Sequence, residues 1–290
     1  PTQSQVALTS NDTPFTYGHR FAFRLTNGNQ TSIDAGDQIR VEHIVESQNM
    51  ATSGWNYTSA SSNITLSFWV KVSVAQTMYI RLLDNDPDYA YSSAFSATTS
   101  WTKITKTFPG NSNLVFNNDS GRGLHVVFIP YFGTSYTTSG HTNDAWLAAD
   151  NSDQATDMAS TWFGTNDATF DITGVQLEVG SVASDFERKS IGQELVDCQR
   201  YYQIVQGHTR NDYRSDNAAR TGNNMNYFTE MRSAPSASTK TAIHNQNMTS
   251  VLYERVSKRG LSFTAVGIAT TGGTDGQQLT ADVQLDAELT

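Results

Sequence analysis

Hydrophobic and polar positions alternate with a period of two along most of the chain. In residues 63–74, NITLSFWVKVSV, the even-numbered positions from Ile64 to Val74 are apolar, and the odd-numbered positions are polar apart from Trp69. This alternation predicts a strand with one buried face. A two-residue link follows, and it predicts a hairpin with the strand at 77–84. The same period predicts further strands at 19–26, 37–46, 89–97, 101–108, 123–132 and 168–180.

Turn-forming segments rich in Gly, Asn, Asp and Pro separate these strands, for example NNDSGRG at 117–123. Short strands with such connectors predict an all-β fold, an antiparallel jelly-roll β-sandwich. Residues 133–167 show no clear periodicity. A loop of that length is often functional, and the alternative is an irregular excursion that packs its own aromatic residues.

A helical pattern follows the last of these strands. Ile191, Leu195, Cys198 and Tyr202 recur at helical spacing after Ser190, which can cap the helix. We expect these side chains to form a buried stripe, with Cys198 as a small core residue rather than a nucleophile. A polar stretch at 207–224 is rich in turn-forming residues, and β-like runs follow it, the first at 225–232. The predicted organisation is a jelly roll at 1–188, a linker helix at 189–203 and a smaller β-module at 204–290.

Charge and composition exclude several classes of partner. The net charge is −9. Residues 1–190 hold 10 basic and 18 acidic groups (10 − 18 = −8), and residues 191–290 hold 9 and 10 (9 − 10 = −1). No basic stripe is present that could bind a nucleic-acid backbone. The sequence contains no run of 18 apolar residues, so it predicts no segment that inserts into a membrane. The chain begins at Pro1 without Met, and we expect it to be a domain cut from a longer polypeptide or a processed product.

Catalytic and metal-binding signatures are weak. The sequence contains no GxSxG, GxxxxGK[ST] or HExxH motif, and its six histidines form no close pair. We therefore predict a protein that is not an enzyme and has no certain cofactor. Asp84, Asp86 and Asp88 in DNDPD are expected to be solvated turn residues. Calcium, which prefers clustered oxygen ligands, is the alternative for this cluster.

Aromatic residues in or beside polar loops are candidates for glycan binding, because sugars stack on ring faces. Trp69 lies on the polar face of its strand, where it would serve as a sugar platform or as a contact between subunits. Each residue taken alone is more often a packing residue. The candidates are Trp55, Tyr57, Trp69, Tyr89, Tyr91, Tyr136, Trp146 and Trp162.

Several segments together resemble a module found in tail fibres and other tail proteins of phages and prophages. They are LSFWVKVSV (66–74), GRGLHVVF (121–128), ITGVQLEVG (172–180), DFERK (185–189), CQRYY (198–202), MRSAPS (231–236) and ADVQLDAEL (281–289). The likeness covers nearly the whole chain apart from residues 133–167. It implies a carbohydrate-binding-like jelly roll, a CQRYY-type linker helix and a terminal β-module.

The resemblance also implies a function. We expect a non-enzymatic virion protein, extracellular when it acts, at the receptor-binding tip of a phage tail fibre. It would be a homotrimer, and its partners would be host surface polysaccharide and other tail proteins. The alternatives are a structural virion component, such as a head fibre, decoration or tail-assembly protein, and a tailspike that depolymerises its glycan receptor.

In this interpretation the segment 170–203 is a structural joint between the two β-domains. Val175, Leu177 and Val179 would face inward on the closing strand, and Phe186 would hold the exit turn against the sandwich. Tyr201 and Tyr202 would begin or abut the first strand of the C-terminal module. The residues assigned to the joint are Val175, Leu177, Phe186, Leu195, Cys198, Tyr201 and Tyr202.

Overall fold

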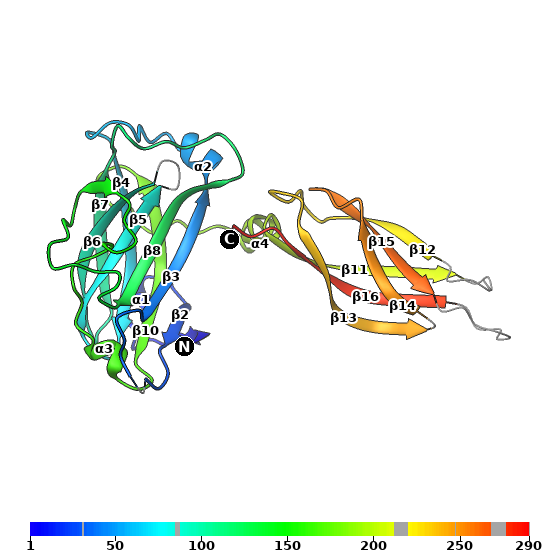
Figure 1. The fold of residues 1–290 in the computed structure, drawn as a ribbon, viewed down its shortest axis with the longest axis horizontal. Helices are drawn as coiled ribbons and strands as arrows, with labels where there is room; N and C mark the ends of the chain where they lie inside the picture. Colours follow the sequence, from blue (N-terminus) through cyan, green and yellow to red (C-terminus); the bar gives the residue numbers. More distant parts are fainter. Residues whose placement is uncertain (31, 85–87, 212–219, 247, 268–276, 290) are drawn as a thin grey trace. The chain divides into compact units, whose positions relative to one another are not determined.

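The computed structural model describes the chain except for residues 31, 85–87, 212–219, 247, 268–276 and 290. The chain divides into two compact units, Pro1–Glu187 and Arg188–Thr290. Both are built mainly from antiparallel strands (Figure 1), so the predicted all-β fold is confirmed.

The elements of the first unit follow the predicted strands closely and add two, β1 at the beginning and the short β9 within residues 133–167. In chain order they are β1 (Thr2–Ala7), α1 (Thr13–Thr16), β2 (Phe21–Thr26), β3 (Gln38–Glu46), α2 (Ser47–Ala51), β4 (Asn63–Val72), β5 (Gln76–Asp84), β6 (Tyr89–Ala97), β7 (Thr102–Pro109), β8 (Arg122–Phe132), β9 (Trp146–Ala148), α3 (Thr161–Gly164) and β10 (Thr169–Val179).

Two five-stranded sheets form the jelly-roll sandwich of this unit, in the orders β1-β2-β10-β4-β7 and β3-β8-β5-β6-β9. The predicted hairpin between β4 and β5 is wrong. β4 pairs with β10 and β7, whereas β5 pairs with β6 and β8. The short link therefore carries the chain from one sheet to the other, so that both apolar faces meet in the same core.

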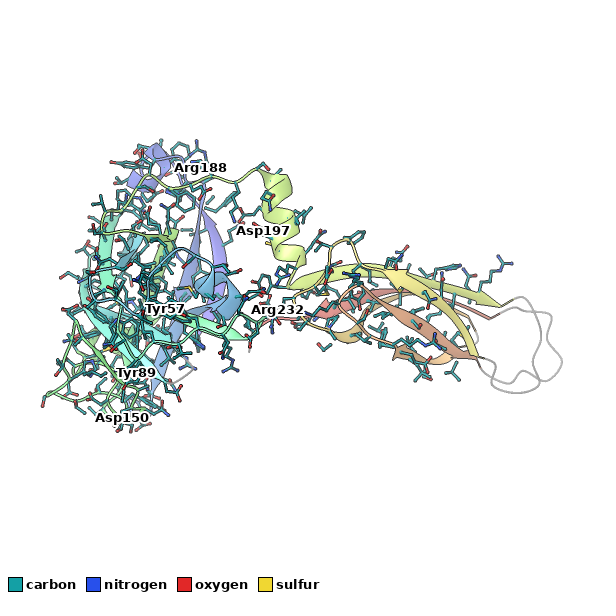
Figure 2. All side chains as sticks on the ribbon, turned by 90° about the horizontal axis from the view of Figure 1, so that it is seen from above. Tyr57, Tyr89, Asp150, Arg188, Asp197 and Arg232 are labelled. Atoms are coloured by element: carbon teal, nitrogen blue, oxygen red, sulfur yellow. The ribbon has the colours of Figure 1, made fainter. Side chains whose placement is uncertain are left out.

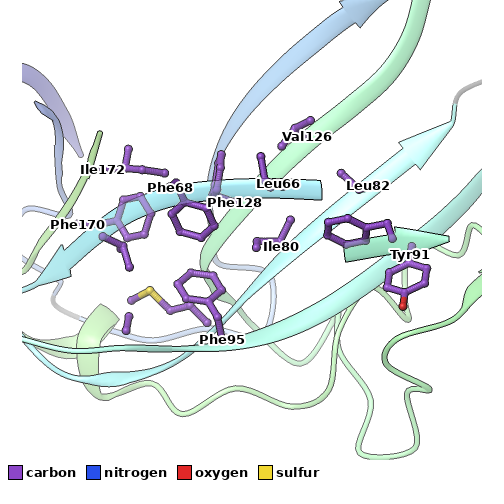
Figure 3. Packing of buried hydrophobic residues seen from close by; sticks show 14 of the residues in the cluster. Leu66, Phe68, Ile80, Leu82, Tyr91, Phe95, Val126, Phe128, Phe170 and Ile172 are labelled. Atoms are coloured by element: carbon purple, nitrogen blue, oxygen red, sulfur yellow. The ribbon is translucent and has the colours of Figure 1, made fainter. Parts of the chain in front are cut away.

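The core between the sheets contains the alternating residues that the sequence singles out. Ile64, Leu66, Phe68, Val70 and Val72 are all buried, and burial of each such side chain stabilises the fold by about 1.5–3 kcal/mol. Aromatic rings from both sheets interlock edge to face in this core (Figure 3). The ring of Phe68 lies 5.4 Å from that of Phe95 and 5.0 Å from that of Phe128.

The segment 133–167 covers the outer face of the second sheet. Ala155, from this segment, is buried in a small cluster with Tyr79 and Ile129, which lie on β5 and β8. Gln154 fixes the segment in place, because its side chain accepts a hydrogen bond from Arg81 and its backbone carbonyl accepts one from Ser92 at 2.7 Å. Burial, together with nearby Arg40, lowers the pKa of Arg81 to about 10. This long segment is thus a packed cover for the sheet.

The second unit is a smaller pair of sheets preceded by a helix. Its elements are α4 (Ile191–Gln199), β11 (Tyr202–Asn211), β12 (Arg220–Asn226), β13 (Ser236–Gln246), β14 (Met248–Glu254), β15 (Gly260–Gly267) and β16 (Gln277–Asp286). The sheets have the orders β11-β16-β13 and β12-β15-β14. Their shared core includes Val205, Phe263, Val283 and Leu285. Among the described helices of the chain, none is long and apolar enough to cross a membrane.

Strand positions in the second unit depart from prediction near its start. The sequence predicts a strand at 225–232, but β12 ends at Asn226. The following residues hydrogen-bond to a turn instead, with Tyr227 N donating to Arg259 O at 2.9 Å and Met231 N donating to Lys258 O at 2.8 Å. The polar stretch 207–224, which is expected to form turns, contains the second half of β11 and the first five residues of β12.

The closing strand β10 differs from the inward pattern expected for it. Gly174 has φ +60°, and the register with β4 shifts between Thr173 and Gln176. This bulge turns Val175 outward, where it is 43% exposed, and Val179 is 46% exposed at the end of the strand. The inward assignment of these two valines is therefore wrong. Leu177 does pack against the core.

Among the other residues assigned to the joint, some lie where the sequence predicts them and some do not. The ring of Phe186 meets that of His19 edge to face at 4.9 Å, and so holds the exit turn against the first unit. Tyr202 begins β11, and Tyr201 O accepts a hydrogen bond from Ala287 N at 2.8 Å. The buried helical stripe is wrong, because α4 contains no buried residue among its nine. Leu195 is 55% exposed and Cys198 is exposed.

Candidate functional site

Most of the aromatic residues proposed from the sequence as glycan platforms are buried. Five are buried and present no ring face on which a sugar could stack: Trp55, Trp69, Tyr91, Trp146 and Trp162. This is a correction of the sequence-based prediction for these five positions.

Three of the buried tryptophans donate a hydrogen bond from the indole N–H to a backbone carbonyl. The indole N–H of Trp55 donates to Ser62 O at 3.1 Å, and that of Trp162 donates to Thr169 O at 3.0 Å. Trp146 donates to Pro109 O at 2.7 Å, and its ring packs edge to face on Tyr91. A buried indole needs such a partner, so these residues have a structural role.

Trp69 does point away from the core, as its place in the alternation predicts. Its ring is nevertheless covered by that of Tyr17, with 5.1 Å between the centroids. Tyr17 follows the short helix α1 and is itself exposed. The accessible ring at this place is therefore Tyr17 rather than Trp69.

Three of the candidates, Tyr57, Tyr89 and Tyr136, remain half-exposed, and Tyr136 lies far from Tyr89. The ring of Tyr57 packs edge to face on that of Phe116, with 4.9 Å between the ring centroids. Tyr57 and Tyr89 are both labelled in Figure 2. Asp84 pairs with both Tyr89 and Leu124, so Tyr89 lies level with Leu124 of β8. Tyr136 packs on Phe132 instead. That position is 132 − 124 = 8 residues further along β8, or about 26 Å at ~3.3 Å per residue.

The calcium candidates have different environments. Asp84 is buried, and its carboxylate accepts a hydrogen bond from Val115 N at 2.9 Å, which gives it a structural role. Asp88 is exposed with φ +66°, and Asp86 lies outside the described residues. Within the described part of the chain, no group of three or more His, Cys, Asp or Glu side chains is placed to hold a metal ion. Calcium at this turn stays a prediction.

A groove of about 450 Å³ lies at the edge of the first sheet, on β1 and β2. Figure 1 shows the N-terminus and β2 together at this place. The groove is lined by Gln3, Ser4, Gln5, Phe21, Ala22 and Phe23.

The pairing of β1 with β2 puts amides and rings on one face of the sheet. Gln5 lies opposite Phe23, and Gln3 lies opposite Leu25. Directly opposed residues of antiparallel strands share a face, and Leu25 marks this face as the one that points toward the core. Gln3 and Gln5 are nevertheless exposed. The sheet therefore extends beyond its cover at this edge and presents its inner face to solvent.

An ion pair on the opposite face holds β2 against β10. Arg24 donates two hydrogen bonds of 2.7 Å to the two carboxylate oxygens of Asp171. The bond to Asp171 raises the pKa of the Arg24 guanidinium. A bidentate pair of this kind fixes geometry as well as adding energy, so the strand that carries Phe21 and Phe23 is firmly placed.

The chemistry of the groove suits a neutral polyhydroxylated ligand. Phe21 is 54% exposed, so part of its ring is accessible to a ligand. Gln3 and Gln5 offer amide groups that both donate and accept hydrogen bonds. Among the described residues, those that line the groove are amides, a hydroxyl and apolar side chains.

The sequence contains only a faint signal for this groove. Phe21 and Phe23 alternate within the predicted strand 19–26, but residues 2–7 are not predicted as a strand. TQSQVA is polar on both faces over most of its length, so it lacks the apolar alternation that marks a half-buried strand. The amides at alternate positions, Gln3 and Gln5, are the feature that could have indicated it.

Comparison with known proteins matches no family model and no curated protein to this chain. A solved structure described as "CBM4 structure and function" is similar at 14% identity over 55% of this chain and 71% of that chain, with a TM-score of 0.32. Recombinant discoidin II of Dictyostelium discoideum is similar at 10% identity over 98% and 94%, with a TM-score of 0.21. Wild-type discoidin II from Dictyostelium discoideum is similar at 11% identity over 100% of this chain and 94% of that chain, with a TM-score of 0.22. With TM-scores below 0.5, none of these likenesses indicates what this chain binds.

Proposed function

We propose that the groove on β1 and β2 binds a short stretch of a host cell-surface polysaccharide. The chain would then be a non-enzymatic virion protein, at the receptor-binding tip of a phage tail fibre. The groove carries this proposal, because it combines an exposed Phe21 ring with the amides of Gln3 and Gln5. Its volume of about 450 Å³ is within the range of sites that hold small ligands.

The resemblance of the segments around 172–180 and 198–202 to phage tail modules supports the place of action. A homotrimer would carry three copies of the groove. Weak sites that engage one polymer together gain affinity through their high effective concentration. A shallow groove can therefore suffice for attachment.

A structural virion component is the second candidate, and one observation favours it. α4 carries exposed apolar residues, and these would suit contact with another virion protein. Under this alternative, the isolated protein would bind virion components and no glycan.

The test is a titration of the protein with polysaccharide fragments from candidate hosts, followed by calorimetry. We expect Phe21→Ser to weaken binding by about ten-fold or more, because the ring contributes about 1.5–3 kcal/mol when covered. Val182→Ser is the matched control, since Val182 is an exposed apolar residue of the same unit outside the groove. Loss of binding in both variants, or in neither, would place the site elsewhere.

Two further outcomes would overturn the proposal itself. Absence of binding to every surface glycan of a host that the intact virion attaches to would remove the glycan-binding function. Release of new reducing ends from the polysaccharide would contradict the non-enzymatic assignment and revive the tailspike alternative.

A further inference from the structure

Helix α4 presents an apolar arc that is exposed among the described residues of its own unit. Ile191 is 86% exposed, Leu195 is 55% exposed, and Val196 and Cys198 are also exposed. At about 100° per residue, Ile191, Leu195 and Cys198 fall within about 60° of one another around the helix axis. These residues form a stripe that would ordinarily be buried.

The polar arc of the same helix is already satisfied by neighbours. Lys189 Nζ lies 2.9 Å from Asp197 Oδ2, and Gln193 donates to Asp197 Oδ1 at 2.8 Å. The hydrogen bond from Lys189 lowers the pKa of Asp197, so this carboxylate stays ionised on its own side of the helix. Figure 2 labels Asp197 beside the helix. The stripe itself carries no charged residue.

The backbone of another exposed apolar residue of the second unit, Phe228, lies near the end of the helix. Gln203 donates to Gln199 O at 2.9 Å and accepts from Phe228 N at 2.9 Å, so its side chain joins the C-terminus of α4 to Phe228. Phe228 is 70% exposed. We call Ile191, Leu195, Cys198 and Phe228 together the α4 patch.

The distribution of charge indicates what covers the α4 patch. Unit 1, residues 1–187, has 8 basic and 18 acidic groups (8 − 18 = −10), and unit 2, residues 188–290, has 11 and 10 (11 − 10 = +1). Copies that meet through unit 2 bring together nearly neutral surfaces, whereas contacts through unit 1 would meet strong repulsion. Unit 2 also has a small core, several of whose members are alanines, and small cores gain stability from association.

We propose that the α4 patch is the surface through which copies of this chain associate, patch against patch. Equivalent patches can pack on one another around a symmetry axis because each buries the same uncharged residues. This inference adds a contact surface to the proposed homotrimer. Only the number of copies, three, rests on the proposed function.

The test is absolute mass by light scattering on a sizing column. The chain is 31.9 kDa, so a trimer would be near 96 kDa (3 × 31.9). We expect Leu195→Glu to shift the protein to monomer at concentrations where wild type is assembled, because it buries a charge in the contact. Ile243→Glu is the matched control, since Ile243 is a 52% exposed residue of the same unit, on β13 and outside the patch. Far-UV circular dichroism checks that both variants fold.

Cys198 provides a second measurement that needs no substitution. In the assembled protein we expect a short bis-maleimide to link Cys198 residues of two copies into a covalent dimer. A wild-type protein that is monomeric at all concentrations would overturn the proposal, as would a Leu195→Glu variant that assembles like wild type. A monomer in which Cys198 resists modification would show that the chain covers its own patch, and this too contradicts association.

Failure of this inference can be told apart from failure of glycan binding. Leu195→Glu should leave the affinity of one groove for a short oligosaccharide unchanged, while it lowers the retention of the protein on long polysaccharide. If wild type binds no oligosaccharide but assembles through α4, the proposed function fails and the inference stands.

Discussion

Arg24→Met should destabilise the first unit more than an ordinary surface substitution. Methionine keeps most of the side-chain stem but removes the guanidinium that donates two bonds of 2.7 Å to Asp171. The Asp171 side chain is only 3% exposed, so its charge would lose its partner while it stays out of water. Removal of one member of a fully buried pair costs about 3–5 kcal/mol.

The position of Arg24 sets the expected size of the effect. Its side chain is 36% exposed, so water can replace part of what the guanidinium supplied. We therefore expect a loss of about 2–3 kcal/mol. For a domain of this size that corresponds to a fall in melting temperature of about 4–12 °C.

Tryptophan fluorescence is the assay of choice, because all five tryptophans lie in the first unit, between Trp55 and Trp162. The double variant Arg24→Met, Asp171→Leu removes both charges and should recover most of the loss. A single variant within about 0.5 kcal/mol of wild type would refute the reasoning, and so would a double variant that is less stable than the single one.

Three further predictions concern single positions. Gly174→Ala should cost about 2–4 kcal/mol by urea unfolding, because an added Cβ would lie 2.6 Å from the His19 ring at φ +60°; a neutral effect would show that His19 moves aside freely. Burial raises the pKa of Tyr227 to about 12, so its contribution to stability is complete below about pH 10 and is lost as the pH rises toward 12. Tyr227→Phe should remove that loss in circular dichroism melts, without lowering stability at pH 7, since the hydroxyl has no hydrogen-bond partner in the described structure. Hydrogen bonds from Thr9 N and then Trp101 lower the pKa of Asp12, so its contribution is present above about pH 4 and is lost on acidification. Asp12→Asn should make fluorescence melts less dependent on pH between about 5 and 3, and an unchanged pH profile would contradict this.

The sandwich strands could be predicted from the sequence because burial on one face imposes a period of two. Predicted residues 63–74 became β4 at Asn63–Val72, and 89–97 matched β6 at Tyr89–Ala97. The period reports burial and says nothing about which strands pair, so the hairpin between β4 and β5 could not be tested from the pattern. β1 was missed for the complementary reason, because its residues are nearly all exposed and leave no pattern.

The site was harder to predict because exposure depends on contacts distant in sequence. Trp162 stands among polar residues, yet its indole reaches Thr169 O and its ring is fully buried. Trp69 lies on the outward face as predicted, and only the packing of Tyr17 removes it from solvent. In α4 the helical period and the Ser190 cap were correct, with Gln193 N donating to Ser190 Oγ at 3.3 Å. The period cannot specify whether the same chain or another copy covers the stripe.

The groove is built on a strand at the margin of its sheet, and this affects how binding should be measured. Among the described strands, β1 pairs with β2 alone, so its amide protons should exchange with deuterium faster than those of β10 or β4 in the same sheet. Each opening of β1 removes Gln3 and Gln5 from the groove. The observed dissociation constant is therefore the intrinsic one divided by the fraction of molecules in which β1 is paired. A ligand in the groove should slow deuterium uptake in residues 2–7, and substitutions that loosen β1 should weaken binding without touching any groove side chain.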